Sequence, residues 1–307
     1  MKVLVTGGSG FLGKRLREKK PSWVYVSSKD YNLENYDECI SLLESTQPDA
    51  IVHLAARVGG IKENWENPAD FYECNVSINT NVLKAARVCG VKRVLSSLST
   101  CAFPDVVKTY PFCEFDILEG PPAITNRPYG FSKRALYIQT LAYRQQYNLN
   151  YSCFCPSNLY GPGDNYDLDS SHFVAAMVRK LQEAWNGDTV EVWGTGRPLR
   201  QQMYIDDLAT IIPSLLESHN TGTPLIVAPS ENLSIKALVD LCVSVSGKDV
   251  KIRYTGDLDG QIRKDGSNRL FLETFPEAKF TSFREGVKKT YEWYDEVVTK
   301  SSSNISK

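Results

Sequence analysis

Short apolar and β-branched runs alternate with amphipathic stretches along the first half of the chain. Such runs predict buried strands, and apolar residues at helical spacing predict helices. The predicted strands are Lys2–Thr6, Trp23–Ser27, Ala50–Leu54, Val94–Leu98 and Tyr151–Cys155. The predicted helices are Phe11–Lys19, Tyr36–Ser45, Ile78–Val88 and Lys133–Gln146. This alternation indicates βαβ units with right-handed crossovers, so it predicts an α/β fold with a doubly wound parallel Rossmann sheet.

The alternation loosens beyond Asn158. A turn-rich stretch at 161–165 precedes a predicted helix, His172–Trp185, and short strands and turns continue to Lys251. The Ser-rich end, Ser301–Lys307, is predicted to be a frayed tail. The expected division is a Rossmann domain at 1–165 with part of 199–225, and a smaller, mainly substrate-binding α/β domain at 166–307.

Composition limits the partners of such a fold. With 307 residues, 42% hydrophobic and 23% charged, the chain can bury a sizeable core. A net charge of -1 and a pI near 6.4 give no overall field, so we predict no nucleic-acid partner and no membrane association. The N-terminus opens directly into a strand without a signal sequence, which predicts a cytoplasmic protein.

The eight cysteines are scattered and lack CxxC spacing. A chain of this length does not need disulfide bonds to hold its fold, and structural zinc sites usually show paired cysteine spacing. We therefore predict mostly buried thiols and no metal site.

A glycine-rich turn follows the first predicted strand and opens the first predicted helix. Glycines permit a tight turn there and let backbone N–H groups approach a pyrophosphate at the positive end of the helix. The spacing is GxxGxxG, and a plain glycine-rich turn is the weaker alternative. The predicted pyrophosphate-binding residues are Gly7, Gly8, Ser9, Gly10, Phe11, Leu12 and Gly13.

The end of the second predicted strand bears on the choice of cofactor. An NAD site usually places an acidic residue there, where it accepts a hydrogen bond from the ribose 2′-hydroxyl. Here Ser28 and Lys29 follow the strand, and a hydroxyl with a cation suits the 2′-phosphate of NADP(H). We therefore favour NADP(H). A solvated Lys29, and Asp30 as a cap of the next turn, are open alternatives.

Tyr129 and Lys133 are separated by one helical turn, so a helix places them on one face. A free phenol has a pKa of about 10, which a neighbouring ammonium group lowers. We predict that Tyr129 donates a proton in a reduction, and that Lys133 lowers its pKa and binds ribose hydroxyls. The YxxxK spacing alone is common, and its place after the strands and the glycine turn gives it weight.

Other candidates follow the fourth predicted strand, at the edge where parallel sheets bind ligands. Ser99 is placed to bond a sugar carbonyl oxygen, and Cys101 to act as a thiolate base if a nearby cation or the cofactor lowers its pKa. The alternative is an inert buried cysteine. His172 is either a proton donor or a structural residue. The cations that either grip a diphosphate or face solvent are Arg179, Lys180, Arg200 and Lys264.

Several stretches together carry a family resemblance over nearly the whole chain. They are VTGGSGFLG at 5–13, VHLAARVGGI at 52–61, LSTCAFP at 98–104, YGFSK at 129–133, PSNLYGPGDN at 156–165 and VWGTGRPLRQQMYIDDLA at 192–209. The chain resembles the GDP-L-fucose synthases, which are the GDP-4-keto-6-deoxy-D-mannose epimerase-reductases of the extended short-chain dehydrogenase/reductase superfamily.

The resemblance implies NADP(H) as cofactor, a GDP-sugar as substrate and a role in GDP-L-fucose biosynthesis. It implies that Tyr129 and Lys133 are the catalytic pair, Ser99 the carbonyl-binding residue, Cys101 the base and His172 the acid. A 4-keto group acidifies the hydrogens at C3 and C5, so the thiol and the imidazole together can invert both centres before reduction at C4.

The resemblance also implies binding contacts and an assembly. Members are homodimers joined by helices that correspond here to Ile78–Val88 and Lys133–Gln146. The implied substrate contacts are Lys180, which many members replace with Arg, and Trp193, Arg200, Asp259 and Lys264. The implied cofactor contacts beyond the glycine turn are Leu54, Ala55, Ala56, Lys133, Pro156, Asn158, Leu159 and His172.

Other functions remain as alternatives. A 4-epimerase or reductase for another nucleotide sugar needs the Tyr and the Lys, but it has no need of a Cys and His pair. A catalytically silent NADP-sensing protein is expected to have lost Tyr129 or Lys133, and both are present.

Overall fold

The computed structural model describes residues 1–256 and 259–305, with the side chains of residue 61 and residues 300–305 left out. The chain forms two compact units, and each gathers separate segments. The first unit contains Met1–Ser157, Leu208–Val227 and Gly266–Ala278, and the second contains Asn158–Asp207, Ala228–Asp265 and the residues from Lys279 onward. The expected division gave part of 199–225 to the first domain, but it gave residues 266–278 to the second domain and ended the first segment at residue 165 instead of Ser157.

The first unit is built on a parallel sheet, as predicted. Within the described residues it has six strands in the order β10-β5-β4-β3-β1-β2, and all neighbours are parallel. Its strands are β1 (Val3–Thr6), β2 (Val24–Val26), β3 (Ala50–His53), β4 (Arg93–Ser97), β5 (Asn150–Pro156) and β10 (Leu225–Val227). The chain leaves β1 for one edge and returns to β1's other side at β3. Ligands bind at such switch points in open parallel sheets.

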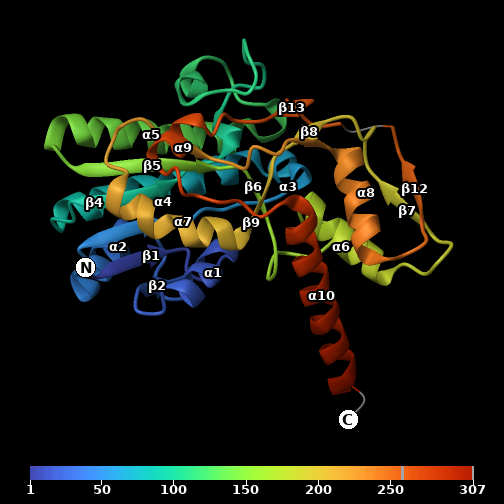
Figure 1. Ribbon diagram of the computed structural model, residues 1–307. Coiled ribbons are helices and arrows are strands. Elements are labelled where there is room, and N and C mark those ends of the chain that lie inside the picture. The colour runs from blue at the N-terminus through green and yellow to red at the C-terminus, as the bar shows by residue number, and fades with distance from the viewer. Residues whose placement is uncertain (257–258, 306–307) are drawn as a thin grey trace. The chain divides into compact units, whose positions relative to one another are not determined.

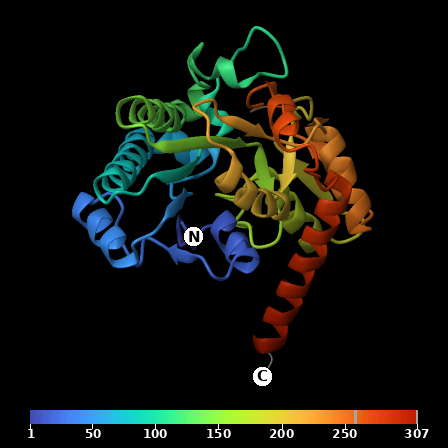
Figure 2. The same ribbon diagram turned by 60° about the vertical axis from the view of Figure 1, so that its left-hand side comes forward.

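Helices cover both faces of this sheet. In Figures 1 and 2, α2, α4 and α5 lie on one face, and α1 and α7 lie on the other. The helices are α1 (Phe11–Lys19), α2 (Tyr36–Thr46), α3 (Ile61–Glu66), α4 (Pro68–Val88), α5 (Arg127–Tyr147), α7 (Ile205–Ser218) and α9 (Arg269–Thr274), with short 3-10 turns η1 (Thr100–Ala102), η2 (Glu114–Leu118) and η3 (Ile124–Asn126). The predicted starts of α4 and α5 were too late. Pro68 and Pro128 occupy the first turns, where proline needs no hydrogen-bond partner for its nitrogen.

The second unit combines small sheets with helices around its own core. The strand pairings are β11-β8-β13, β12-β7 and β6-β9. Tyr160, Val178, Leu181, Val239 and Phe283 are among the buried residues of the core. The elements are β6 (Asn158–Tyr160), α6 (Phe173–Glu183), β7 (Thr189–Val192), β8 (Leu199–Arg200), β9 (Gln202–Tyr204), β11 (Leu233–Ser234), α8 (Ile235–Ser246), β12 (Lys251–Tyr254), β13 (Arg263–Lys264) and α10 (Phe283–Ile305).

The prediction of a frayed Ser-rich tail is wrong as far as Ile305. Helix α10 continues through Ser301 to Ile305, and residues 306 and 307 lie outside the described part of the chain. No glycine or proline interrupts the sequence between Val287 and Ile305, so no helix-breaking residue stops the backbone.

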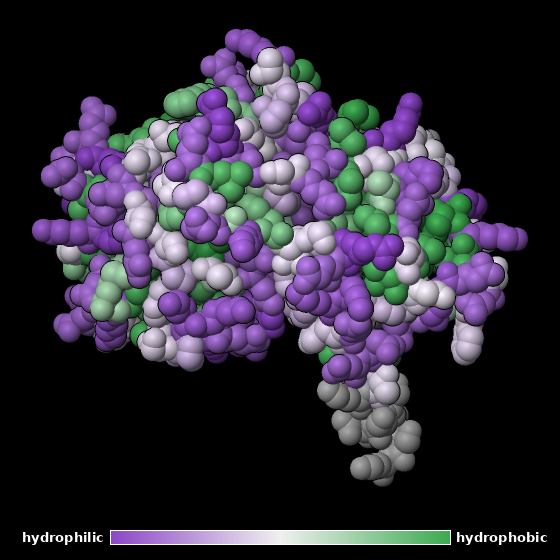
Figure 3. All heavy atoms as spheres, viewed as in Figure 1, coloured by the Kyte–Doolittle hydropathy of each residue, from purple (hydrophilic) through white to green (hydrophobic). Residues whose placement is uncertain are grey.

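The surface and the thiols agree with a water-exposed α/β protein. The face shown in Figure 3 is mostly hydrophilic, with small separated hydrophobic patches. Among the described residues, no helix is long and apolar enough to cross a membrane. All eight cysteines are described as thiols and not as disulfides, and only Cys39, Cys153, Cys155 and Cys242 are buried. The other four are partly exposed, so the expectation that most thiols are buried holds for half of them.

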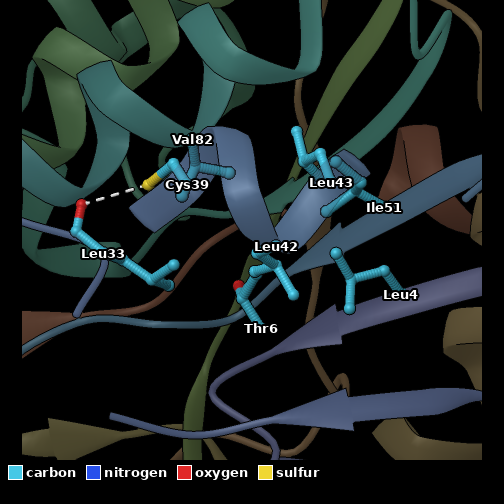
Figure 4. A pocket seen from close by; sticks show the side chains of 8 residues that line it. All are labelled: Leu4, Thr6, Leu33, Cys39, Leu42, Leu43, Ile51 and Val82. Carbon is cyan, nitrogen blue, oxygen red and sulfur yellow. Dashed lines mark hydrogen bonds between the residues drawn. The ribbon is translucent and has the colours of Figure 1, made fainter. Parts of the chain in front are cut away.

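A small pocket beneath the glycine turn is part of the first unit's core. Burial raises the pKa of the Cys39 thiol in its wall to about 12, which makes this thiol inert near neutral pH. We therefore interpret the pocket as a packing space between β1, β3, α2 and α4. As Figure 4 shows, it is lined by Leu4, Thr6, Leu33, Cys39, Leu42, Leu43, Ile51 and Val82.

Candidate active site

The glycine turn after β1 is packed so closely that side chains are excluded. Gly7 has a φ of 74°, and a Cβ atom there would lie 2.8 Å from the backbone nitrogen of Ala55. A Cβ on Gly13 would collide with the backbone of Gly7 and Gly8. The N–H of Gly8 donates to the Val26 carbonyl over 2.7 Å, which ties the turn to β2. The structure therefore brings the glycine turn against the residues that follow β3, at the switch point.

The turn leads straight into α1, which begins at Phe11 after Gly10. Its first turn, Phe11-Leu12-Gly13-Lys14, contains no acidic side chain. The positive end of the helix therefore faces a close-packed glycine backbone, an arrangement that fits a bound pyrophosphate.

The residues after β2 form a turn that is closed by a side chain. The carboxylate of Asp30 accepts from the backbone N–H and the hydroxyl of Ser27, over 2.8 and 2.7 Å. These hydrogen bonds hold the pKa of Asp30 below its ordinary value. Asp30 therefore closes its own turn. Ser28 and Lys29 are exposed beside it.

Helix α5 carries the Tyr129 and Lys133 pair in the predicted geometry. The Lys133 ammonium group lies 5.8 Å from the centre of the Tyr129 ring and donates to the Ser97 carbonyl at the end of β4, over 2.9 Å. Ser99 hydrogen-bonds the Tyr129 side chain. Tyr129 is 8% exposed and Lys133 is 3% exposed, so water has little access to either group.

Burial dominates the titration of this pair. It raises the pKa of Tyr129 above its ordinary value, the Cys101 charge raises it further, and the Ser99 hydrogen bond opposes both. Burial lowers the pKa of Lys133 to about 8. Desolvation therefore sets the direction of the Tyr129 pKa, and of the effects on it the one that lowers it comes from Ser99. The phenol keeps its proton at neutral pH, and Lys133 keeps its charge below about pH 8.

Cys101 lies in the same cluster, in η1. The Ser99 hydroxyl, at the start of η1, accepts from the Cys101 backbone N–H over 3.2 Å. The Cys101 sulfur accepts from the side-chain amide of Asn126 over 2.9 Å. A Cβ on Gly130 would collide with the Cys101 carbonyl, so η1 packs tightly against the start of α5. Ser99, Cys101, Tyr129 and Lys133 are therefore gathered in one place in the first unit.

A buried chain of hydrogen bonds, which the sequence argument missed, runs behind this cluster. His53 Nδ1 lies 2.8 Å from the Thr6 hydroxyl, and His53 Nε2 lies 3.0 Å from Asn79 Oδ1. Asn79 in turn donates to the Ser132 carbonyl over 3.4 Å, and the Ala55 N–H donates to Thr6 over 3.3 Å. The chain thus links the glycine turn to α5. In the sequence, the one indication of this role is that Asn79 is a polar residue at a position on the buried face of α4.

This series of hydrogen bonds also fixes the protonation state of the His53 ring. Burial and the Lys133 charge lower the pKa of His53 to about 4, so the ring is neutral near pH 7. The Asn79 oxygen can only accept, so Nε2 carries the proton and Nδ1 accepts from Thr6. His53 therefore connects the residue before the glycine turn to α4, which in turn contacts α5.

The remaining catalytic candidate, His172, belongs to the second unit. It lies just before α6, and its ring is exposed. Partial desolvation by the surrounding protein, and then the Lys264 charge, lower its pKa.

Two cations of the second unit are neighbours across strands. Arg200 on β8 is paired in register with Lys264 on β13, so both side chains share a face of the small sheet. Like charges in this position repel one another unless an anion lies between them. The Lys264 charge also acts on His172, and the Arg200 side chain donates to the Leu199 carbonyl over 2.8 Å.

The other predicted substrate residues line the ends of β7 and nearby loops. Lys180 donates to the Glu191 carbonyl over 2.9 Å, and Trp193 is 61% exposed. The Asp259 carboxylate accepts from the Thr195 N–H over 2.8 Å and from its hydroxyl over 2.5 Å. These hydrogen bonds lower the pKa of Asp259. Asp259 thus braces the loop after Trp193.

Three of the implied cofactor contacts are divided between the two units. Pro156 ends β5 in the first unit. Asn158 and Leu159 form β6 in the second unit, where they pair with Gln202 and Met203 of β9.

Comparisons with known proteins agree with this geometry. Residues 3–228 match the family described as NAD dependent epimerase/dehydratase family. The chain is 34% identical to a GDP-L-fucose synthase from Dictyostelium discoideum over 95% of this chain and 94% of that protein. It is 33% identical to a probable GDP-L-fucose synthase from Drosophila melanogaster, over 96% and 97%.

A solved structure is similar over the same span. The GDP-L-fucose synthetase from Naegleria fowleri bound to NADP is 32% identical, covers 97% of this chain and 93% of that chain, and superimposes with a TM-score of 0.89. The resemblance and the fold predicted from the sequence are both confirmed. The chain belongs to the GDP-L-fucose synthase family, within the NAD dependent epimerase/dehydratase family.

Proposed function

We propose that this protein converts GDP-4-keto-6-deoxy-D-mannose to GDP-L-fucose, by epimerisation at C3 and C5 followed by NADPH-dependent reduction at C4. The supporting observation is the cluster at the start of α5. It joins a proton-holding Tyr129 and a buried Lys133 to the thiol of Cys101. A simple reductase or 4-epimerase needs the phenol and the ammonium group but has no use for the thiol.

NADP(H) fits the first unit because side chains at Gly7 and Gly13 would fill the cradle that a pyrophosphate needs. When bound, NADPH supplies the hydride. Exposed Ser28 and Lys29 would hold the 2′-phosphate, and Lys133 the ribose hydroxyls. The other residues that would hold the cofactor are Gly8, Ser9, Gly10, Phe11, Leu12, Leu54, Ala55, Ala56, Pro156, Asn158, Leu159 and His172.

In the reduction, Tyr129 gives its proton to the C4 oxygen. The raised pKa of Tyr129 keeps that proton in place until the oxygen becomes basic. The Lys133 ammonium group then stabilises the phenolate through its charge. Ser99 orients the carbonyl oxygen by a hydrogen bond.

In the epimerisation, Cys101 removes a proton next to the ketone, and His172 returns one from the opposite face. Removal is possible because the C4 ketone delocalises the charge of the resulting enediolate. His172 must be protonated to act. Burial and then the Lys264 charge lower the pKa of His172, and a diphosphate bound to Lys264 would offset the second of these two effects.

The second unit supplies the grip on the substrate. Arg200 and Lys264 share a face and would hold the diphosphate between them. Lys180, Trp193 and Asp259 would contact the rest of the GDP-sugar.

The test is NADPH consumption by the purified protein. We expect consumption with GDP-4-keto-6-deoxy-D-mannose and none with GDP-mannose, which has no ketone to reduce. A 4-epimerase would instead interconvert nucleotide sugars without net use of NADPH, and that outcome would favour the alternative function.

We also propose a cytoplasmic homodimer joined through α4 and α5. These helices pack on each other and expose Tyr72, Phe131 and Ile138 at 44%, 41% and 47%. Eight cysteines that are thiols and not disulfides suit a reducing compartment. Light scattering should give twice the 34.4 kDa chain mass, and Ile138→Glu should reduce it to the monomer. A monomeric wild-type protein would reject the dimer.

A further inference from the structure

Asn126 stands at the start of α5 without doing what asparagine usually does there. An asparagine before the first helical turn normally accepts hydrogen bonds from the backbone N–H groups of that turn. Among the described residues, the Asn126 side chain makes no such bond, and its Oδ1 atom is buried without a hydrogen-bond partner. Its Nδ2 atom donates to the Cys101 sulfur over 2.9 Å.

The orientation of the Asn126 side chain is energetically unfavourable by itself, so it needs an explanation. Leaving a buried carbonyl oxygen unpaired is unfavourable, and so is giving up the capping hydrogen bond. A neutral thiol gains little from an N–H donor because its sulfur is a weak acceptor. A thiolate gains much more, since hydrogen bonds to a charged acceptor are stronger and favour the charged form.

The surroundings act in the same direction. Cys101 lies against the start of α5, where a Cβ on Gly130 would strike its carbonyl. The start of a helix carries partial positive charge, which also favours a thiolate. Asn126 would complete this environment by directing an N–H at the sulfur itself.

We propose that Asn126 is the positioning residue for the base: its side-chain amide holds the Cys101 sulfur as a thiolate, aimed for proton removal from the sugar. The inference rests on the proposed role of Cys101. Asn126 acts through Cys101 and does not itself take the proton.

The test measures how readily Cys101 ionises, independently of turnover. The full-length protein is alkylated with iodoacetamide over a series of pH values, and the Cys101 peptide is followed by mass spectrometry. In Asn126→Ala we expect the apparent pKa of Cys101 to rise by about one, so that alkylation below it slows about tenfold. In Asn126→Asp we expect a larger slowing, because a carboxylate of the same shape repels the thiolate. Asn126→Ser keeps a small donor and should lie between wild type and Asn126→Ala.

Asn35 provides the matched control. It stands before α2, where its side chain accepts from the Asp37 and Glu38 N–H groups over 2.9 and 3.4 Å. Asn35→Ala therefore removes an ordinary cap, and we expect it to lower the unfolding midpoint without changing Cys101 alkylation. A purely structural role for Asn126 would give the same pattern.

The outcomes separate the inference from the proposed function. Folded Asn126 variants, Asn126→Ser included, that alkylate at the wild-type rate at every pH would overturn the role of Asn126. Slowed alkylation would support it. If alkylation slows but the wild-type protein exchanges no deuterium into the sugar, the thiolate assignment stands and the proposed epimerisation fails.

Discussion

The two units hold their polar residues in opposite ways. In the first unit, Tyr129 and Lys133 are almost fully buried, and neighbouring elements fix them by hydrogen bonds. In the second unit, Arg200 and Lys264 face the same side as cross-strand neighbours, and His172 is exposed beside Lys264. The first arrangement is preorganised for proton transfer. The second places two like charges side by side on partly exposed residues.

This difference suggests a division of labour. Reacting groups must be held in place before the reaction, because the energy of reorganising them would add to the barrier. Cations that bind a diphosphate can remain near water, since the ligand itself compensates their repulsion. Mutations in the two units should therefore separate the rate of chemistry from the affinity for substrate.

The largest expected effect is on chemistry in the first unit. Tyr129→Phe removes the proton donor and should lower the rate of NADPH consumption by about 10²- to 10⁴-fold, while deuterium exchange at C3 and C5 continues. Tyr137→Phe, which alters another buried tyrosine of α5, is the control and should leave the rate near wild type. Equal loss of exchange and reduction in Tyr129→Phe would argue against separate roles for Tyr129 and Cys101.

The next effect is on affinity in the second unit. Arg200→Ala or Lys264→Ala should raise KM for the GDP-sugar by roughly 10- to 100-fold with a smaller change in kcat, because each removes a charged contact to the diphosphate. The unfolding midpoint of each variant is measured alongside, because Arg200 also donates to the Leu199 carbonyl. Lys236→Ala, which breaks an exposed ion pair with Asp240, is the control. An unchanged KM in both variants would remove the diphosphate site.

The titration of Lys133 gives a smaller and graded effect. Its pKa of about 8 lies below its ordinary 10.5, so Lys133 loses its charge as the pH rises through 8. The kcat/KM for reduction should then fall, towards tenfold per pH unit. The free energy of unfolding should instead increase with pH. Between pH 8 and 10.5, Lys133 is protonated in the unfolded chain but loses its proton in the folded protein. The cost of burying its charge therefore decreases, and the protein becomes more stable over this pH range. A flat kcat/KM profile through pH 9 would contradict this assignment.

The smallest effect concerns the buried chain behind the cluster. Asn79→Ala leaves the His53 Nε2–H without its acceptor and should cost about 1–3 kcal/mol in the free energy of unfolding, measured in urea. It should also raise KM for NADPH, because the chain reaches the glycine turn through Thr6. Asn81→Ala, on the same helix with a hydrogen bond to the exposed Glu34 carbonyl, should cost much less. Equal losses in the free energy of unfolding for the two variants would show that this series of hydrogen bonds has no special role.

Much of the first unit could be predicted because its signals are local. The strand runs, the glycine spacing and the helical spacing of Tyr129 and Lys133 all lie within short segments. The predicted start of α4 was too late because the first turns of this helix are polar, although Pro68 marks where it begins. Strand β10 could not be placed, since it joins the sheet only after the chain has passed through the second unit.

The candidate site was predicted in part for the same reason. Residue types and short spacings identified Ser99, Cys101 and the pair on α5. They could not identify Asn126 or Asn79, whose partners lie 25 and 26 residues away in the chain. Pairings over such separations are decided by the packing of α4, α5 and η1, and no local pattern records it.

The central claim is that one protein carries both a reductase and an epimerase apparatus on the same ketosugar. It is tested most directly by incubating the protein with NADPH and GDP-4-keto-6-deoxy-D-mannose in D₂O and examining the product by NMR. We predict GDP-L-fucose with deuterium at C3 and C5 for the wild type, and no deuterium incorporation with Cys101→Ser. A reduced sugar with unaltered C3 and C5 centres, or undiminished exchange in Cys101→Ser, would contradict the account.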